Sequence, residues 1–174
     1  PYEKNPMVKE SNIFKCAEII SRIKNTLSKN DYTLFRLTKE TTKRRPLKFR
    51  TEGRISNSDK FMVLGHPTGL PLIETRSTKV IDNESDFLFR INSDTFGGNS
   101  GSPVFNQKTG LVEGILTDGD QDYQLNKQKG CVETYVCPEN GCKGENVVRI
   151  TNIPELVPGM TPVEPIFDLA NPRL

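Results

Sequence analysis

The sequence lacks the features that mark several classes of protein. Its 24 Lys and Arg residues and 22 Asp and Glu residues give a net charge of only +2, so there is no strong electrostatic case for binding nucleic acid. No apolar run approaches the ~18 residues that a membrane-spanning helix needs, and no internal repeat or low-complexity tract is present. With 34% hydrophobic and 26% charged residues, the 174-residue chain is instead typical of a globular protein with a packed core.

The chain also lacks an initiating methionine, and it holds a single histidine, His66. The opening PYEKNPMVKE has neither the basic segment nor the apolar segment of a secretory signal peptide. We therefore expect the chain to be a processed form or a fragment, from which any signal peptide is already gone.

The chain has four cysteines, Cys16, Cys131, Cys137 and Cys142. The last three have the spacing C-x5-C-x4-C, and the single histidine is remote from them, which disfavours a zinc site. The turn signal PENG lies between Cys137 and Cys142 and brings them near each other. A disulfide-stapled loop, formed in an oxidising compartment, is the preferred interpretation, and a zinc-stabilised structural domain is the alternative. The sequence does not choose among the three pairings that four cysteines allow.

Short segments rich in β-branched and aromatic residues recur along the chain, separated by Gly, Pro, Asn and Asp. This spacing predicts an all-β barrel or sandwich. The predicted strands are residues 33–37, 60–66, 78–82, 87–91, 102–106, 111–117, 132–136 and 146–153.

Two segments are harder to assign. Residues 11–28 have apolar side chains at helical spacing, although IFKCAEII within them is also compatible with a strand. Residues 154–174 contain five prolines, which predicts an extended segment lying over the surface.

The stretch GGNSGSP, residues 97–103, has the composition that acyl transfer by a serine requires. The hydroxyl must be exposed on a tight turn, and backbone N–H groups must converge where negative charge develops on the substrate oxygen. Gly98 and Ser100 would supply those N–H groups, Ser100 would supply the nucleophile, and Gly101 would let the chain leave without a clash. An ordinary loop between two strands is the alternative.

GNSGSPVFN resembles the nucleophile motif of the trypsin-like (chymotrypsin-fold) serine proteases, in particular the bacterial glutamyl-endopeptidase-like branch. NDYTLFRL is similar to the segment that carries the family's triad aspartate, which implies that Asp31 orients the base; a turn or capping role is its alternative. FMVLGHPTGLPL resembles the strand and turn that begin the second barrel, and VEGILTDG the strand that pairs with substrate backbone. These motifs follow the family order from about residue 13 to 153.

The resemblance implies a double six-stranded β-barrel, of which this chain provides the end of the first barrel and all of the second. The implied division is residues 1–50 for the C-terminal part of the first barrel, 51–59 for the linker, 60–153 for the second barrel and 154–174 for an extended C-terminal segment. No cofactor is expected, and neither a membrane nor a nucleic acid is an expected partner.

The histidine base of this family precedes the aspartate, yet no histidine occurs between Pro1 and Asp31. His66 lies in a glycine- and proline-bounded turn, which favours a structural role over a catalytic one. We therefore expect an N-terminal fragment of the same protein to carry the base. The alternative is a catalytically inactive module that binds peptides. Asn99, which precedes the serine, is uncharged and would not pair with a new N-terminus.

The resemblance places Asp94 at the base of the primary specificity pocket, where a carboxylate favours substrate Arg or Lys. Asp118 and Asp120 add negative charge nearby, while Leu116, Thr117 and Asp118 are implied to line the substrate's path. Asp94 capping a turn is one alternative, and Thr117 binding an acidic side chain is another. The substrate is expected to be a protein or peptide, and the location secreted or periplasmic.

Overall fold

The computed structural model describes residues 8–41, 44–77, 79–138 and 141–157. Within these ranges the chain forms eleven strands and four short 3-10 helices and no α-helix, which confirms the all-β prediction. None of the helices in the described part of the chain has the length and apolar character needed to cross a membrane. The predicted extended tail lies mostly outside the described residues, and its first part forms a 3-10 turn, η4 (Pro154–Leu156).

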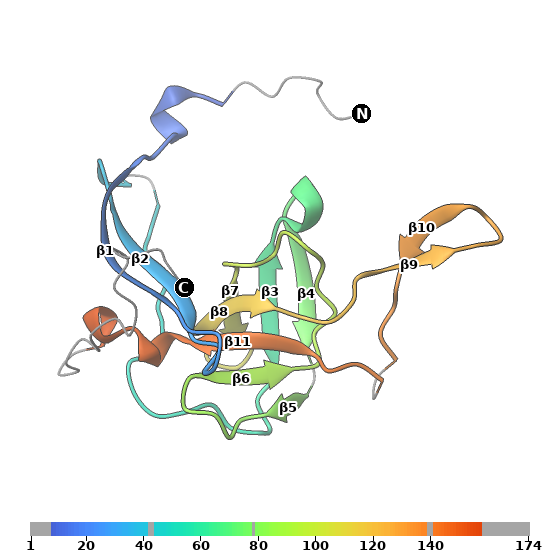
Figure 1. Cartoon of the computed structure of the whole chain (residues 1–174). Helices are drawn as coiled ribbons and strands as arrows, with labels where there is room; N and C mark the ends of the chain where they lie inside the picture. The colour runs from blue at the N-terminus through green and yellow to red at the C-terminus, as the bar shows by residue number, and fades with distance from the viewer. Residues whose placement is uncertain (1–7, 42–43, 78, 139–140, 158–174) are drawn as a thin grey trace, which may run out of the picture.

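Seven antiparallel strands form one strongly curled sheet in the order β4-β3-β7-β8-β11-β6-β5 (Figure 1). Their inward side chains alternate with outward ones, as β3 shows by burying Phe61, Val63 and Gly65. The core of the sheet includes Phe61 and Phe89, whose ring centroids lie 5.3 Å apart. The strands are β3 (Phe61–Gly65), β4 (Ile73–Ser77), β5 (Val80–Asp82), β6 (Leu88–Ile91), β7 (Pro103–Asn106), β8 (Val112–Asp118) and β11 (Glu145–Arg149).

The ambiguous N-terminal segment is a strand, so the helical interpretation is wrong. β1 (Cys16–Lys24) pairs with β2 (Asp31–Leu37) in a separate hairpin. The β-branched isoleucines that suggested a helix stand on both faces of the strand, and the apolar spacing is broken by β-bulges. A 3-10 helix, η1 (Glu10–Asn12), precedes it.

One end of this hairpin is docked and the rest is exposed (Figure 1). Tyr32 packs with Ile150 of η3 (Ile150–Asn152), the 3-10 turn that follows β11, and with Ile153, which lies between η3 and η4. Farther along, the register partners Ile19 and Phe35 are 57% and 48% exposed. Paired apolar side chains left in water are unusual on a folded surface, so this face is suited to contact with further polypeptide.

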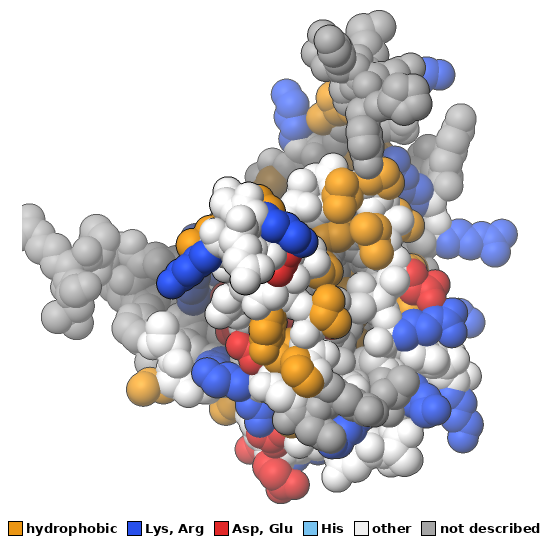
Figure 2. Space-filling model, turned by 90° about the vertical axis from the view of Figure 1, so that its right-hand side faces the viewer, with side chains coloured by type: hydrophobic (Ala, Val, Ile, Leu, Met, Phe, Trp, Pro, Cys, Tyr) orange, Lys and Arg blue, Asp and Glu red, His pale blue; other side chains and the backbone are white. Residues whose placement is uncertain are grey.

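A second hairpin consists of β9 (Tyr123–Asn126) and β10 (Cys131–Thr134) and extends away from the large sheet (Figure 1). It points toward the viewer in Figure 2, where lysine and hydrophobic side chains lie on its surface. A disulfide joins Cys137 and Cys142, just after this hairpin, and staples the loop leading to β11. The sequence predicted a disulfide-stapled loop but left the pairing open. Cys16 and Cys131 are free and exposed. No cluster of metal-binding side chains occurs among the residues described, so nothing there supports the zinc alternative.

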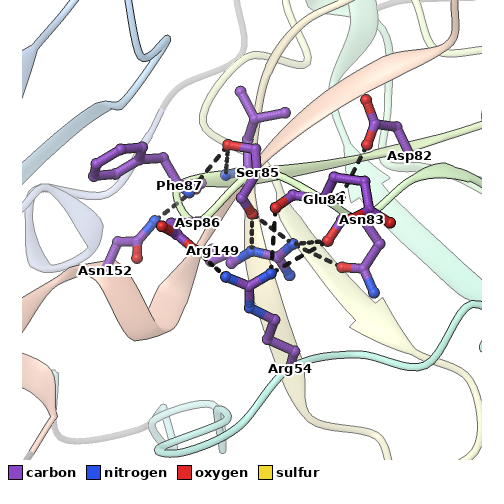
Figure 3. Close-up of polar contacts among 10 residues, drawn as sticks. Arg54, Asp82, Asn83, Glu84, Ser85, Asp86, Phe87, Arg149 and Asn152 are labelled. Carbon is purple, nitrogen blue, oxygen red and sulfur yellow. Dashed lines mark hydrogen bonds and ion pairs between the residues drawn. The ribbon is translucent and has the colours of Figure 1, made fainter.

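A buried arginine fixes the far end of β11 (Figure 3). Arg149 is 3% exposed and donates to the backbone oxygens of Asn83 and Ser85 and to the Asn83 side chain. Burial lowers the pKa of Arg149 to about 10, and the guanidinium still stacks 5.4 Å from the Phe89 ring. The 83–87 loop is thereby tied to β11, whose opposite end carries Glu145.

Candidate functional site

Ser100 lies on a tight turn between β6 and β7. Gly98 and Gly101, with φ of +95° and +90°, hold the left-handed conformations that this turn needs. The Ser102 amide donates to the Asn99 carbonyl at 2.9 Å, and the Gly101 amide donates to Leu116 of β8 at 2.7 Å. Ser100 is exposed, and its hydroxyl donates to the Thr117 carbonyl at 2.8 Å. The turn therefore presents the hydroxyl beside the end of β8.

Gly97 is held through both of its backbone polar groups. The Gly97 carbonyl accepts from the Thr68 amide at 2.8 Å, while the Gly97 amide donates to Asp122 Oδ2 at 2.7 Å. Because the bond is trans, the Gly98 N–H points away from Thr68. Within the described residues, the Gly98 and Ser100 amides have no acceptor. Both are therefore available to an oxyanion.

The turn after β3 packs tightly against Gly98. It comprises His66 and η2 (Pro67–Gly69), and Thr68 adopts a positive φ of 50°, which is uncommon for a β-branched residue. A Cβ on Gly98 would lie 2.9 Å from the Thr68 nitrogen and 3.4 Å from the His66 carbonyl oxygen. Only glycine fits between this turn and Ser100.

Among the described residues, neither His66 nor Asp31 forms a hydrogen bond with Ser100, whose hydroxyl is bonded to Thr117. His66 is exposed, and its Nδ1 lies 3.0 Å from the Leu70 carbonyl oxygen, in keeping with the predicted structural role. Asp31 opens β2 beside the docked Tyr32, and its half-buried carboxylate has no hydrogen-bond or ion-pair partner among the described residues. The described part of the chain brings no base to Ser100.

A cavity of about 60 Å³ opens directly beside Ser100. It is built from the segment before the serine, the end of β8 with the loop that follows, and the first residue of β11. No Lys or Arg lines it. Its lining residues are Thr95, Phe96, Gly97, Asn99, Ser100, Leu116, Thr117, Asp118, Gly119, Asp120, Asp122 and Glu145.

The three aspartates in this lining each accept a hydrogen bond from an N–H donor. Asp118 accepts from the Asn146 side chain, and Asp122 accepts from the Gly97 amide. Hydrogen bonds from the backbone amides of Lys143 and then Gln121 lower the pKa of Asp120. Each of these side chains is at least partly exposed.

Glu145 is different, because it is only 5% exposed. Burial raises its pKa to about 7, and the nearby charges of Asp122 and Asp94 add to that increase, while hydrogen bonds from Thr95 oppose it. Sequence analysis missed Glu145. Its only signal was an acidic residue at the start of the apolar run ENVVRI.

Of the residues predicted to bind substrate, some line the cavity and one does not. Leu116, Thr117 and Asp118 line the cavity, with Ser100 beside them. Asp94 is absent from the lining, and its Oδ2 accepts from the Cys137 amide at 3.4 Å. Its carboxylate is still close enough to Glu145 to contribute to the raised pKa of that residue.

Replacing Asp122 with alanine is expected to slow the reaction of Ser100 with a fluorophosphonate about tenfold. The substitution removes the acceptor of the Gly97 amide, a charge-assisted bond worth about 1.5–3 kcal/mol. It thereby loosens the backbone of Gly97, whose carbonyl group shares a peptide bond with the Gly98 N–H. Asp122→Asn keeps an acceptor oxygen and should react within about threefold of the wild type. Equal rates for Asp122→Ala and the wild type would contradict this positioning role.

The profile of the family described as "Trypsin-like peptidase domain" matches residues 8–115. No curated protein matches the sequence. Two solved structures of Rv3671c from M. tuberculosis H37Rv are similar to it. A serine-to-alanine mutant in the inactive form is 17% identical with a TM-score of 0.45, and covers 76% of this chain and 60% of its own.

The second structure is the active form of the Rv3671c protease, 17% identical with a TM-score of 0.46, and the match covers 76% of this chain and 56% of that one. The chain therefore spans somewhat more than half the length of the solved structures that it matches.

Proposed function

Because this chain belongs to the family of trypsin-like peptidase domains and has its all-β, chymotrypsin-like fold, we propose that it is the serine-bearing part of a serine endopeptidase. Ser100 would attack the carbonyl carbon of a peptide bond, and the resulting oxyanion would be bound by the Gly98 and Ser100 amides. The observation that carries this proposal is the exposed Ser100 hydroxyl beside two backbone amides that lack any acceptor among the described residues. Substrate backbone would pair along Leu116 to Asp118.

The proposed base is a histidine on an N-terminal fragment of the same protein. Two features support this assignment. The Asp31 carboxylate has no partner among the described residues, so it is available to accept a hydrogen bond from an imidazole and orient it. The hairpin that carries Asp31 exposes Ile19 and Phe35, which further strands of the first barrel would cover. We accordingly retain the division into two barrels with a linker at residues 51–59.

The proposed location is secreted or periplasmic. The disulfide between Cys137 and Cys142 supports it, since such bonds persist in oxidising compartments. The substrate would be a protein or peptide, with no requirement for a cofactor.

Fluorophosphonate labelling tests the proposal. The purified protein should be phosphonylated at Ser100, located by peptide mass spectrometry, and intact mass should reveal a co-purifying or contiguous segment that carries histidine. Labelling should be abolished by heat denaturation, because only a folded turn activates the hydroxyl.

His66→Ala provides the matched variant, and it should label within about twofold of the wild-type rate. A loss of about 10³-fold or more in this variant would make His66 the base and overturn the upstream assignment. No labelling of Ser100 when the histidine-bearing segment is present would favour the inactive peptide-binding module.

A further inference from the structure

The cavity beside Ser100 contains a buried acid that no cation balances. Of its four carboxylates, Glu145 alone is almost fully buried, and no lysine or arginine is present in the lining. Its hydrogen-bond donor is Thr95, a neutral residue. A buried ionised carboxylate without a positive partner is strongly unfavourable, so the site favours any cation that can reach it.

Gly119 exposes this carboxylate to the cavity. Glu145 stands at the start of β11, and its side-chain oxygens occupy the space that a Cβ on Gly119 would fill. Any larger residue at position 119 would collide with the carboxylate or cover it. Since Gly119 and Glu145 both line the cavity, the absence of a side chain at 119 leaves the acid reachable from the side of Ser100.

We propose that this cavity receives a lysine or arginine side chain of the substrate, immediately before the bond that is cut, and that Glu145 is the residue that determines this specificity. The inference rests on the proposed function for the identity of the ligand as a substrate, but the preference for a cation rests on the cavity alone. The sequence resemblance suggested Asp94 for this role. Asp94 would instead contribute only the electrostatic effect of its negative charge, which lies close to Glu145.

The charges around Glu145 all favour a cation. Asp122 and Asp94 lie near enough to raise the pKa of Glu145, and Asp118 and Asp120 complete the acidic lining. An acidic substrate side chain, the ligand that the alternative role of Thr117 implies, would meet four carboxylates and is disfavoured. Asp118 and Asp120 already accept hydrogen bonds from N–H donors, so they add to the negative potential of the cavity more than they bind the cation directly.

A small aryl amidine tests the inference without requiring catalysis. p-Aminobenzamidine, whose fluorescence rises in a dry pocket, should bind the purified protein at least tenfold more tightly than the neutral amide or the carboxylate of the same ring. Its affinity should increase about tenfold per pH unit from pH 5 to 7 and level off above, because Glu145 must be ionised and its pKa in the empty cavity is about 7.

Two variants that each remove one negative charge distinguish the specific effect of Glu145 from the general effect of negative charge in the cavity. Glu145→Gln should weaken amidine binding at pH 8 by at least thirtyfold and remove the pH dependence. Asp120→Asn, in the same cavity, should weaken it by threefold or less, because that carboxylate is exposed and screened. Similar affinities for the three probes, a flat pH profile of the wild type, or equal effects of the two variants would overturn the inference.

The pH profile needs no variant, so the inference stays testable if Glu145→Gln does not fold. Amidine binding and fluorophosphonate labelling test the cation pocket and the peptidase proposal separately, so either can be rejected without the other. Binding without labelling would retain the cation pocket and reject the peptidase. Labelling without binding would retain the peptidase and reject the pocket assignment.

Discussion

The Gly98→Ala protein is expected to react with a fluorophosphonate 10²–10³-fold more slowly than the wild type, the range observed when an oxyanion-binding donor is lost. Two constraints act on this one position. Its φ of +95° disfavours any L-side chain, and an alanine Cβ would lie 2.9 Å from the Thr68 nitrogen. Relief of the clash would move the peptide that aims the Gly98 N–H. The rate constant for labelling, measured under pseudo-first-order conditions, checks this prediction.

Gly110→Ala supplies the matched control. Gly110 also has a positive φ, +69°, but it lies in the turn between β7 and β8, with nothing within 4 Å of a Cβ built on it. The substitution should therefore cost about 1 kcal/mol of folding free energy through backbone strain and leave the labelling rate unchanged. If both variants slow labelling equally, general destabilisation, and not the loss of an oriented amide, is the cause.

Glu145→Gln should raise the free energy of unfolding at pH 8 by up to about 3 kcal/mol. The pKa of Glu145 is raised from 4.5 to about 7 in the folded protein, and the difference corresponds to about that energy. Below pH 4.5 the group is neutral in both the folded and the unfolded state. As the pH rises from 4.5 to 7, the unfolded chain ionises first, so the wild type loses stability, and above 7 the penalty is constant.

Urea unfolding of both proteins from pH 4 to 8 measures this effect. The difference between variant and wild type isolates Glu145, because all other titrating groups are common to both proteins. The stabilisation should be near zero at pH 4 and grow through the stated window. A variant that is less stable than the wild type at pH 8, or a difference that does not change with pH, would contradict the assigned burial.

A buried acid that destabilises the folded chain is characteristic of a functional position. The same carboxylate that costs stability in the empty cavity gains a partner when a cation enters, so ligand binding and stability should be linked. The amidine in the preceding tests should therefore raise the urea midpoint of the wild type more than that of Glu145→Gln.

Much of the strand content could be predicted from local sequence, and the exceptions have physical reasons. The apolar strands β3, β6, β7 and β8 fall within a residue or two of their predicted bounds. β4 and β9 were missed because both are exposed over much of their length and lack an apolar face. In β1 the helical spacing of isoleucines was coincidental, and pairing with β2 decided the conformation.

The nucleophile turn was more predictable than the pocket. GGNSGSP encodes its own backbone shape, since glycines at positive φ on either side of a serine fix a tight bend. Glu145 has no such local signature. Its role depends on Gly119, 26 residues earlier in the chain, and on the pairing of β11 with β8 that brings the two together. Asp94 was predicted to lie in the specificity pocket because of its sequence distance from Ser100, but sequence distance alone does not determine which side chain reaches the cavity.

Because of the two hydrogen bonds of Gly97, the position of the neighbouring Gly98 amide depends on two loops that are remote from each other in sequence. Thr68 follows β3, and Asp122 precedes the projecting β9–β10 hairpin. Local opening of either loop would free the peptide to rotate while the seven-stranded sheet stayed intact. Reactivity at Ser100 should therefore disappear at a lower denaturant concentration than the sheet does, so the loss of chemistry would precede the loss of fold.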